Sequence, residues 1–204
     1  MLAGKFIRDY PALFHMTRAG VWPLIQKHGL LSTAAICESL ELSEAETLRH
    51  LRTYRSEKIR LGEFVLRDNK PLRQRNLARN LHGSGLTCED WHEMLNRRVF
   101  FSTKTEFVAK LRQSYLSDPV TIIAVDTARL LQSHLATIDL SSKNSGAARM
   151  PTHMKSRETF IKLEKFSLHS KSKPKELTVY HSVPDLEQLT VKVYELPAWK
   201  LFRP

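Results

Sequence analysis

The hydrophobic residues of the chain fall into short runs separated by charged stretches, and these runs predict both strands and helices. The run from Val120 to Val125, bounded by Pro119 and Asp126, is typical of a strand buried on both faces. We therefore expect this strand to lie centrally in a sheet. Further strands are predicted where β-branched and aromatic residues gather or alternate with polar ones, at residues 12–17, 64–66, 98–102, 176–183 and 189–196.

Helices are predicted where apolar residues recur at helical spacing next to capping residues. Gly29 stands where a helix C-cap favours glycine, directly after one such segment. Ser43 and the acidic residues after it predict the start of a polar helix that runs to about Lys58. Thr87 can cap another helix. The remaining helices are predicted at residues 19–28, 89–96 and 103–115.

The order of these elements predicts the fold class. Helices dominate the first half of the chain and strands the second, which favours a single α+β domain over residues 1–204. A chain of 204 residues can bury a core without disulfides or a structural metal. Residues 141–150, rich in Ser, Gly and Asn, predict a loop, whereas residues 160–166 fit either a strand or a short helix.

Cysteine content and the absence of long apolar runs exclude several protein classes. Cys37 and Cys88 are far apart and form no Cys-x-x-Cys pattern, so we expect two reduced thiols rather than a disulfide or a zinc site. The first ten residues are charged at Lys5, Arg8 and Asp9, and no apolar run approaches the ~18 residues of a membrane span. We expect a cytoplasmic protein with no metal and no membrane contact.

The formal net charge of +11 is concentrated in two stretches. Residues 49–79 contain ten Lys and Arg against three acidic residues, and residues 143–175 contain nine against two. Clustered cations attract phosphates through Coulomb forces and counterion release, so we expect a nucleic acid or polyphosphate partner, with a solvated basic surface as the alternative. The candidate nucleic-acid contacts are Arg49, Arg52, Arg55, Arg73 and Arg75.

Three places in the chain are candidates for chemistry. His15 and Thr17 stand at the end of a predicted strand, the pair Phe100 and Phe101 lies in another, and Glu176 opens a third. Taken separately, a strand-end histidine is more often structural, an aromatic pair is more often core, and a lone glutamate is more often on the surface.

Taken in order, these elements resemble the ADP-ribosyltransferase superfamily, which includes poly-ADP-ribose polymerases and DNA-modifying toxins. His15 and Thr17 are similar to its first motif, a strand ending in His followed by a hydroxyl. The segment from Val99 to Lys104 resembles the second motif, although Phe100 stands where tyrosine is commoner. The run from Glu176 to Tyr180 resembles the third.

Within that superfamily the chain is most similar to small bacterial proteins related to the DNA-targeting toxin branch. These proteins also begin with a His-x-Thr strand and a helix ending in Gly-Leu-Leu, which resembles residues 29–31 here. Met16 departs from the polymerases, where glycine is common. The resemblance implies a split antiparallel β-sheet core flanked by helices that lie mainly in the N-terminal half.

The resemblance also implies an activity, the cleavage of nicotinamide from NAD and the transfer of ADP-ribose to an acceptor. The reaction passes through an oxocarbenium-like centre that a carboxylate stabilises. Glu176 would then orient the ribose and the nucleophile and act as general base if burial raises its pKa. His15 would bind a hydroxyl of the adenosine ribose with support from Thr17. The remaining NAD-binding candidates are Arg98, Phe100, Phe101 and Ser102.

Several alternatives stay open. Nucleic acid, DNA or RNA, is the main expected acceptor, but a protein acceptor is compatible with the charge. An RNA 2′-phosphotransferase-like enzyme also uses NAD, and a catalytically inactive module of the same fold would only bind nucleotides or nucleic acid. Arg73, Arg75 and Arg98 are candidates for the pyrophosphate. The loop at residues 144–146, with Arg149, is either an ordinary turn or a ligand contact. A protein antidote and the oligomeric state remain open.

Overall fold

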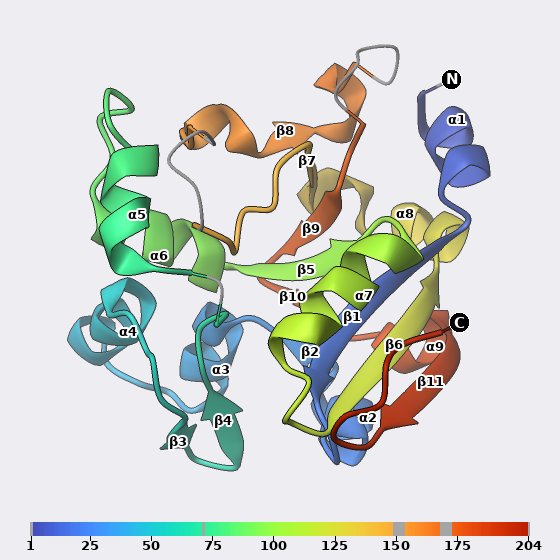
Figure 1. Cartoon of the computed structure of the whole chain (residues 1–204), viewed down its shortest axis with the longest axis horizontal. Helices are drawn as coiled ribbons and strands as arrows, with labels where there is room; N and C mark the ends of the chain where they lie inside the picture. Colours follow the sequence, from blue (N-terminus) through green and yellow to red (C-terminus); the bar gives the residue numbers. More distant parts are fainter. Residues whose placement is uncertain (1, 71, 149–153, 168–172, 204) are drawn as a thin grey trace.

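A computed structural model describes residues 2–70, 72–148, 154–167 and 173–203 of the chain. Its centre is a seven-stranded antiparallel sheet with strand order β11-β6-β1-β5-β9-β7-β8 (Figure 1). Its strands are β1 (Ala12–Arg18), β5 (Arg98–Ser102), β6 (Val120–Asp126), β7 (Ile138–Ser141), β8 (Ile161–Lys162), β9 (Glu176–Tyr180) and β11 (Thr190–Leu196). The mixed α+β class predicted from the sequence is confirmed.

Two small antiparallel sheets and a set of helices complete the fold. One small sheet pairs β2 (Leu30–Leu31) with β10 (Ser182–Val183), and the other pairs β3 (Ile59–Leu61) with β4 (Phe64–Leu66). The helices are α1 (Leu2–Asp9), α2 (Trp22–His28), α3 (Thr33–Ser39), α4 (Glu44–Arg52), α5 (Gln74–Asn80), α6 (Cys88–Asn96), α7 (Thr105–Ser114), α8 (Thr127–His134) and α9 (Leu186–Leu189), with 3-10 turns at Leu135–Thr137, Arg157–Thr159 and Leu163–Lys165.

Helices cover both faces of the large sheet. On one face, apolar residues of α1, α2, α8 and α9 form the largest core cluster with the sheet, including Phe6, Ile25, Leu130 and Leu186. On the other face α7 lies across the sheet (Figure 1), where Val108 packs in a second cluster. Helices α4 to α6 stand to one side of the sheet. Apolar burial on both faces fixes the sheet between two helical layers.

The predicted strand β6 is confirmed as buried on both faces, but it does not lie at the centre of the sheet. Its first six residues, from Val120 to Val125, are all buried. It pairs with β1 on one side and with β11 on the other, which makes it second from one edge of the sheet. A strand covered on both faces has no need of polar positions, which explains its continuous apolar run.

The large sheet is divided between β1 and β5. Strand β1 pairs with β6 over its whole length, from Ala12 to Arg18, whereas it pairs with β5 only where Phe14 faces Ser102. The half β11-β6-β1 and the half β5-β9-β7-β8 therefore diverge from this one point. Beyond Phe14, the edge of β1 that faces β5 has no strand partner among the described residues.

Several predicted boundaries are wrong for identifiable reasons. The polar helix ends at Arg52 rather than at Lys58, because the backbone N–H of Arg55 donates to the Asp68 carboxylate and draws the chain away. The first predicted helix begins at Trp22 rather than at residue 19, because proline in its first turn favours a helix start. The predicted strand 176–183 breaks at His181, where φ is 72°.

The structure also resolves segments that the sequence left open or missed. Strand β7 lies at Ile138–Ser141, just before the predicted loop, and the undecided segment 160–166 contains β8 followed by a 3-10 turn.

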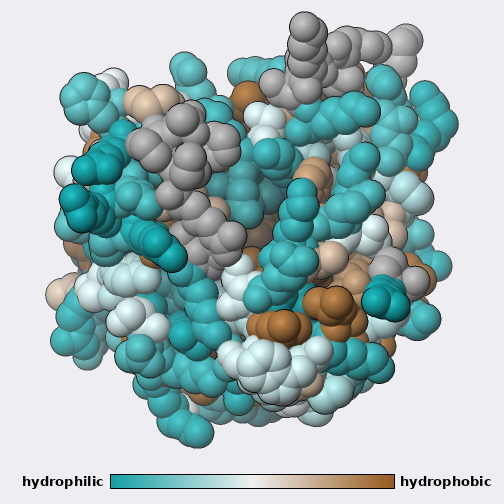
Figure 2. Space-filling model, viewed as in Figure 1, coloured by the Kyte–Doolittle hydropathy of each residue, from teal (hydrophilic) through white to brown (hydrophobic). Residues whose placement is uncertain are grey.

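Within the described ranges no helix is long and apolar enough to cross a membrane. Cys37 and Cys88 are both free thiols. On the face shown in Figure 2 hydrophilic side chains predominate.

Candidate functional site

A cleft of about 490 Å³ opens where β1 and β5 part. Its walls come from β1, α2, β2, the connection between β4 and α5, β5, α7, the loop after β7 and the first residue of β9. This volume lies within the range of about 300–1,000 Å³ that is usual for small-molecule sites. The split of the sheet thus produces a cavity suited to a ligand of moderate size.

Except for the pyrophosphate candidates Arg73 and Arg75, all residues that the sequence analysis assigned to NAD or catalysis line this one cleft. They come from three strands that are distant in sequence, and they are His15, Thr17, Arg98, Phe100, Phe101, Ser102 and Glu176. The strand register explains how they meet. Phe14 faces Ser102 on β5, and Ser102 faces Glu176 on β9, so the three strands converge at the cleft.

The same register divides the cleft into two sides. Directly opposed residues project to the same face of a sheet, so Phe14, Ser102 and Glu176 share the face that α7 covers. His15 and Thr17 alternate with Phe14 along β1 and project to the opposite face. The cleft reaches both sides because the two halves of the sheet separate at this point.

His15 is oriented by the neighbouring strand. Its Nδ1 lies 2.8 Å from the carbonyl oxygen of Phe100, and its ring meets the ring of Phe101 edge-on at 5.9 Å. A carbonyl only accepts hydrogen bonds, so Nδ1 carries the proton. Burial lowers the pKa of His15 and keeps the imidazole neutral. Nε2 is then a hydrogen-bond acceptor, and no described residue bonds to it.

Glu176 is held by the loop that follows β7. The hydroxyl of Ser145 donates to the Glu176 carboxylate at 2.6 Å, and the backbone N–H of Ser145 donates at 3.1 Å. Burial raises the pKa of Glu176, while the two hydrogen bonds from Ser145 act in the opposite direction. A carboxyl group with a raised pKa, fixed at the wall of a cleft, has the properties of a general base.

A buried lysine supports this loop from behind. The Nζ atom of Lys155 donates to the carbonyl oxygens of Asn144 at 3.2 Å and Ser145 at 3.0 Å, and it lies 5.0 Å from the ring centre of Trp91. Lys155 is only 1% exposed, and burial lowers its pKa to about 8, an effect that Glu176 partly offsets. Lys155 therefore fixes the loop whose serine holds Glu176.

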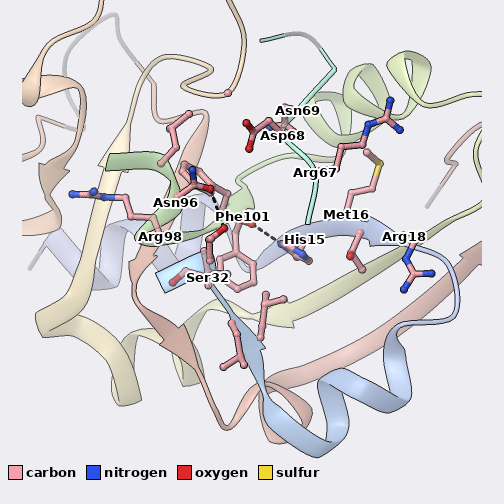
Figure 3. A pocket seen from close by; sticks show the side chains of 18 of the residues that line it. His15, Met16, Arg18, Ser32, Arg67, Asp68, Asn69, Asn96, Arg98 and Phe101 are labelled. Atoms are coloured by element: carbon pink, nitrogen blue, oxygen red, sulfur yellow. Dashed lines mark hydrogen bonds between the residues drawn. The ribbon is translucent and has the colours of Figure 1, made fainter. Parts of the chain in front are cut away.

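Two of the arginines predicted to bind a ligand, Arg98 and Arg55, are bonded to other residues of the protein. The guanidinium of Arg98 points away from His15 (Figure 3), donates to Asp139 at 3.3 Å and lies 4.4 Å from the ring centre of Phe160. Arg55, predicted on the surface of a helix, is buried beyond the helix end and forms an ion pair with Asp68 at 2.7 Å. This position corrects its assignment to a helix face.

The other predicted nucleic-acid contacts lie outside the cleft. Arg49, Arg73 and Arg75 are exposed on or next to helices α4 and α5. Arg52 is engaged by acidic groups of α6, with Asp90 at 2.8 Å and Glu93 at 3.6 Å. None of these four residues lines the cleft.

The two phenylalanines of β5 differ in their surroundings. Phe101 is fully buried in the largest core cluster. Phe100 is half-buried and meets Phe160 edge-on at 6.2 Å, next to the cluster that contains Trp91. Both rings line the cleft, but each also packs in a core.

Sequence reasoning missed most of the polar lining of the cleft. The residues concerned are Arg18, Ser32, Arg67, Asp68, Asn69, Asn96, Lys110 and Lys175. Their only signals were the two basic stretches, which do not distinguish a cleft residue from a surface residue. The loop at residues 144–146, which the sequence left open as a turn or a ligand contact, lines the cleft through Asn144 and Gly146, whereas Arg149 lies outside the described residues. The contacts by which Ser145 and Lys155 act gave no signal, because each reaches across the fold.

The short segment that connects β4 to α5 forms one wall of the cleft. Asp68 is fixed by Arg55, and Asn69 accepts a hydrogen bond from the hydroxyl of Tyr115 at 3.2 Å. A Cβ added at Gly146 would lie 2.3 Å from Nδ2 of Asn69. Glycine at this position thus allows the loop that holds Glu176 to approach the segment closely.

In the part of the chain that the structure describes, no group of three or more His, Cys, Asp or Glu side chains could hold a metal ion. The arrangement offers a neutral imidazole, a carboxylate of raised pKa and aromatic walls. Such groups can bind a polar organic ligand and accept a proton from it.

Comparison with known proteins gives a family without an assigned activity. The family described as "Family of unknown function (DUF7002)" matches residues 11–190, a range that includes every residue lining the cleft. No curated protein matches the chain. Because the match spans most of its length, the chain belongs to DUF7002.

Proposed function

We propose that this protein is an NAD-dependent ADP-ribosyltransferase that transfers ADP-ribose to a nucleic acid. The observation that carries the proposal is the cleft at the split of the sheet, which gathers the histidine, aromatic and glutamate motifs. These motifs come from β1, β5 and β9, and their order along the chain is that of the superfamily they resemble.

The residues in the cleft fit the chemical groups of NAD. Nε2 of the neutral His15 can accept a hydrogen bond from a ribose hydroxyl, and Thr17 lies two residues further along the same strand. The half-buried ring of Phe100 offers an apolar wall to a planar group. Nε of Arg67 is buried and has no hydrogen-bond partner in the part of the chain that the structure describes, which suits an anionic group such as a pyrophosphate.

NAD supplies a ribose whose bond to nicotinamide breaks as positive charge develops at the sugar. The Glu176 carboxylate can stabilise that charge electrostatically, because hydrogen bonds to Ser145 already fix its position. The same carboxylate can accept the proton of the incoming nucleophile, since burial raises its pKa. His15 acts by binding and orientation, because its lowered pKa keeps it uncharged.

The acceptor is assigned from charge. Arg18, Arg67, Lys110 and Lys175 line the cleft, in addition to the basic stretches that favour nucleic acid along the chain. Cations near a reacting group attract phosphates and raise their local concentration.

The test is the release of free nicotinamide from NAD by the purified protein, measured with and without DNA, RNA and mixed cell protein. We expect release that depends on one nucleic acid and falls at least about 100-fold in Glu176→Gln, which keeps the side-chain shape and removes the charge. Glu164→Gln, an exposed glutamate outside the cleft, is the matched control and should not change the rate.

Three results would contradict the proposal. Release that requires a 2′-phosphorylated RNA and does not need Glu176 would indicate the phosphotransferase. Release that depends only on protein would change the acceptor class. If no mixture releases nicotinamide and calorimetry detects no binding of NAD, the alternative of a catalytically inactive binding module would hold.

A further inference from the structure

Two aromatic rings and two cations form a connected group next to the loop that holds Glu176. The rings of Trp91 and Phe160 are stacked, with centres 5.8 Å apart and an angle of 18° between their planes. The Nζ atom of Lys155 lies 5.0 Å from the ring centre of Trp91, and the guanidinium of Arg98 lies 4.4 Å from that of Phe160. Each ring therefore contacts one cation and the other ring. We call these four residues the cation–aromatic stack.

The cation–aromatic stack lies on the face of the sheet that carries Glu176. Arg98, Phe100 and Ser102 alternate along β5 and project to one face, and Ser102 is directly opposed to Glu176 on β9. The ring of Phe160 meets that of Phe100 edge-on at 6.2 Å on this face. The stack thus packs between the cleft wall formed by Phe100 and the helix α6 that carries Trp91.

The lysine end of the stack reaches the loop after β7. A lysine ammonium has three N–H donors and no acceptor. Lys155 donates to the carbonyl oxygens of Asn144 and Ser145, which use two of these donors. The face of an aromatic ring is negative, so Trp91 is suited to receive the third. The ammonium is therefore held between the loop and the indole ring.

The arginine end of the stack is anchored to the sheet and to α6. Arg98 donates to Asp139 of β7 at 3.3 Å and to the carbonyl oxygen of Met94 in α6 at 2.8 Å. Trp91 belongs to the same helix and is fully buried. With Phe160 packed against one ring face, Trp91 presents a fixed surface to Lys155.

We propose that Trp91 is a positioning residue for Glu176: its ring holds the ammonium of Lys155, and Lys155 holds the loop whose Ser145 bonds to the carboxylate. The attraction between a cation and an aromatic ring is stronger when water is excluded, and Lys155 is only 1% exposed. The inference rests on the proposed function only where a rate is measured.

The charge of Lys155 depends on its other neighbours as well as on Trp91. Among the described residues, Glu176 favours the ammonium form, whereas Lys143 and burial disfavour it and lower the pKa of Lys155 to about 8. A ring that attracts the ammonium opposes this effect, so weakening the ring should lower the pKa of Lys155 further. This expectation gives a measurement that needs no activity.

The contact is tested by titration in the absence of NAD. NMR of protein labelled with ¹³C at the lysine Cε atoms would follow Lys155, whose signal Lys155→Met identifies. Replacement of tryptophan by 5-fluorotryptophan nearly preserves the ring volume and withdraws electron density from its face. We expect the Lys155 titration midpoint to move to lower pH by a few tenths of a pH unit. Trp91→Phe is the matched control, because only Trp22 and Trp199 then carry fluorine and the midpoint should not respond to it.

The effect on Glu176 is tested by a second titration, with ¹³C at the glutamate carboxyl groups. Ser145 and Lys155 both lower the pKa of Glu176. In Trp91→Leu the loop loses its support, so the Glu176 midpoint should rise by about 0.5 pH unit. Trp91→Phe keeps an aromatic face and should recover most of this change. Trp22→Phe, outside the cleft lining, controls for loss of an indole elsewhere, and thermal unfolding verifies that each variant is folded.

The rate of nicotinamide release gives a third readout. We expect Trp91→Leu to lower kcat by about 10-fold with little change in KM for NAD, because the carboxylate is displaced while the rest of the cleft is retained. The alkaline fall in rate should begin about one pH unit lower than in the wild type. Trp91→Phe should lie between the two.

Two titration results would overturn the inference: a Lys155 midpoint that ignores fluorination, or equal responses to fluorination in wild type and Trp91→Phe. A Glu176 midpoint unchanged in folded Trp91→Leu would also overturn it. If both midpoints respond but nicotinamide is never released, the positioning of Glu176 by Trp91 stands and the proposed function fails. If nicotinamide is released and folded Trp91→Leu matches the wild-type rate at every pH, the proposed function stands and the role of Trp91 fails.

Discussion

The hydroxyl of Ser145 donates a 2.6 Å hydrogen bond to the carboxylate of Glu176, from 31 residues away in the sequence. The backbone N–H of Ser145 donates to the same group, and Ser145 is itself fully buried. A carboxylate that is bonded in this way has one orientation and a pKa that depends on its partner. Two predictions about the activity follow from this contact and its support.

Substitution of Ser145→Ala should reduce the rate of nicotinamide release by about 10- to 100-fold, because a hydrogen bond to a charged group is worth about 1.5–3 kcal/mol. The loss should fall on kcat rather than on KM for NAD. Since Ser145 lowers the pKa of Glu176, its removal should shift the acid limb of the pH–rate profile to higher pH.

The control for this variant is Ser84→Ala. It removes a serine hydroxyl that donates a bond of the same length, 2.6 Å, to the carbonyl of Leu81, outside the cleft. Equal effects of the two substitutions on kcat, or an unmoved acid limb in Ser145→Ala, would show that the hydroxyl does not act through Glu176.

Lys155 should limit the activity at alkaline pH. Burial lowers its pKa to about 8, so the positive charge beside Ser145 and Glu176 is present below that pH and lost above it. Lys143 is the other charged group that influences Lys155, and it also lowers the pKa. We expect the wild-type rate to fall above about pH 8 and the fall to disappear in Lys155→Met. The pH–rate profiles of both proteins are the measurement.

Lys165→Met, on an exposed 3-10 turn, serves as control for Lys155→Met and should retain the alkaline fall. If the rate of Lys155→Met still falls at alkaline pH as the wild-type rate does, another titrating group causes the fall.

His15 should make the protein less stable in acid. Burial holds the pKa of His15 below its ordinary value, so the native state stays neutral where the unfolded chain takes up a proton. The free energy of unfolding should therefore fall as pH drops below about 6.5, the ordinary pKa of histidine. His15→Gln removes the titrating ring and should lose less stability between about pH 7 and pH 5 than the wild type.

Urea unfolding at each pH measures this difference, and His82→Gln, an exposed histidine, is the control. If wild type and His15→Gln lose equal stability on acidification, the neutral state of His15 is not fixed by the fold.

Gly29→Ala should destabilise the fold by about 3 kcal/mol, from overpacking and from left-handed strain together. An added Cβ would lie 2.4 Å from the Cα of Pro184, and φ of Gly29 is +76°. For a chain of this size the loss corresponds to roughly 6–12 °C in Tm.

Gly20→Ala separates the two causes of this loss. Its φ is also +76°, but no atom lies within 4 Å of the added Cβ, so only the strain remains. Calorimetry should give a loss of about 1 kcal/mol for Gly20→Ala. Equal losses in the two variants would mean that the contact with Pro184 relaxes at no cost.

Local signals in the sequence located many of the elements because those signals act over a few residues. The capping box of Ser43 and Glu46 starts α4 where it was predicted. The continuous apolar run of β6 identified a strand covered on both faces, since such a strand carries no polar alternation. Gly29 ends α2 because its N–H bonds to Ile25 while its φ is positive.

The same local reasoning failed where a distant partner decides the conformation. The polar helix stops at Arg52 because Asp68 binds the backbone and side chain of Arg55, which no helical spacing can indicate. The strand after Glu176 stops at Tyr180 because His181 turns the chain so that Val183 can pair with Leu30.

The sequence by itself determined the α+β class, most strands, several caps, and which candidate residues stand on β1, β5 and β9, although His15 lies in the middle of β1 rather than at its end. Only the tertiary structure decided that these residues meet, because the meeting depends on β1 and β5 pairing at Phe14 and separating beyond it. It also decided that Arg55 is paired with Asp68, while Nε of Arg67 has no hydrogen-bond partner among the described residues. Burial and partners set the state of a charged side chain, and both arise only when distant segments pack together.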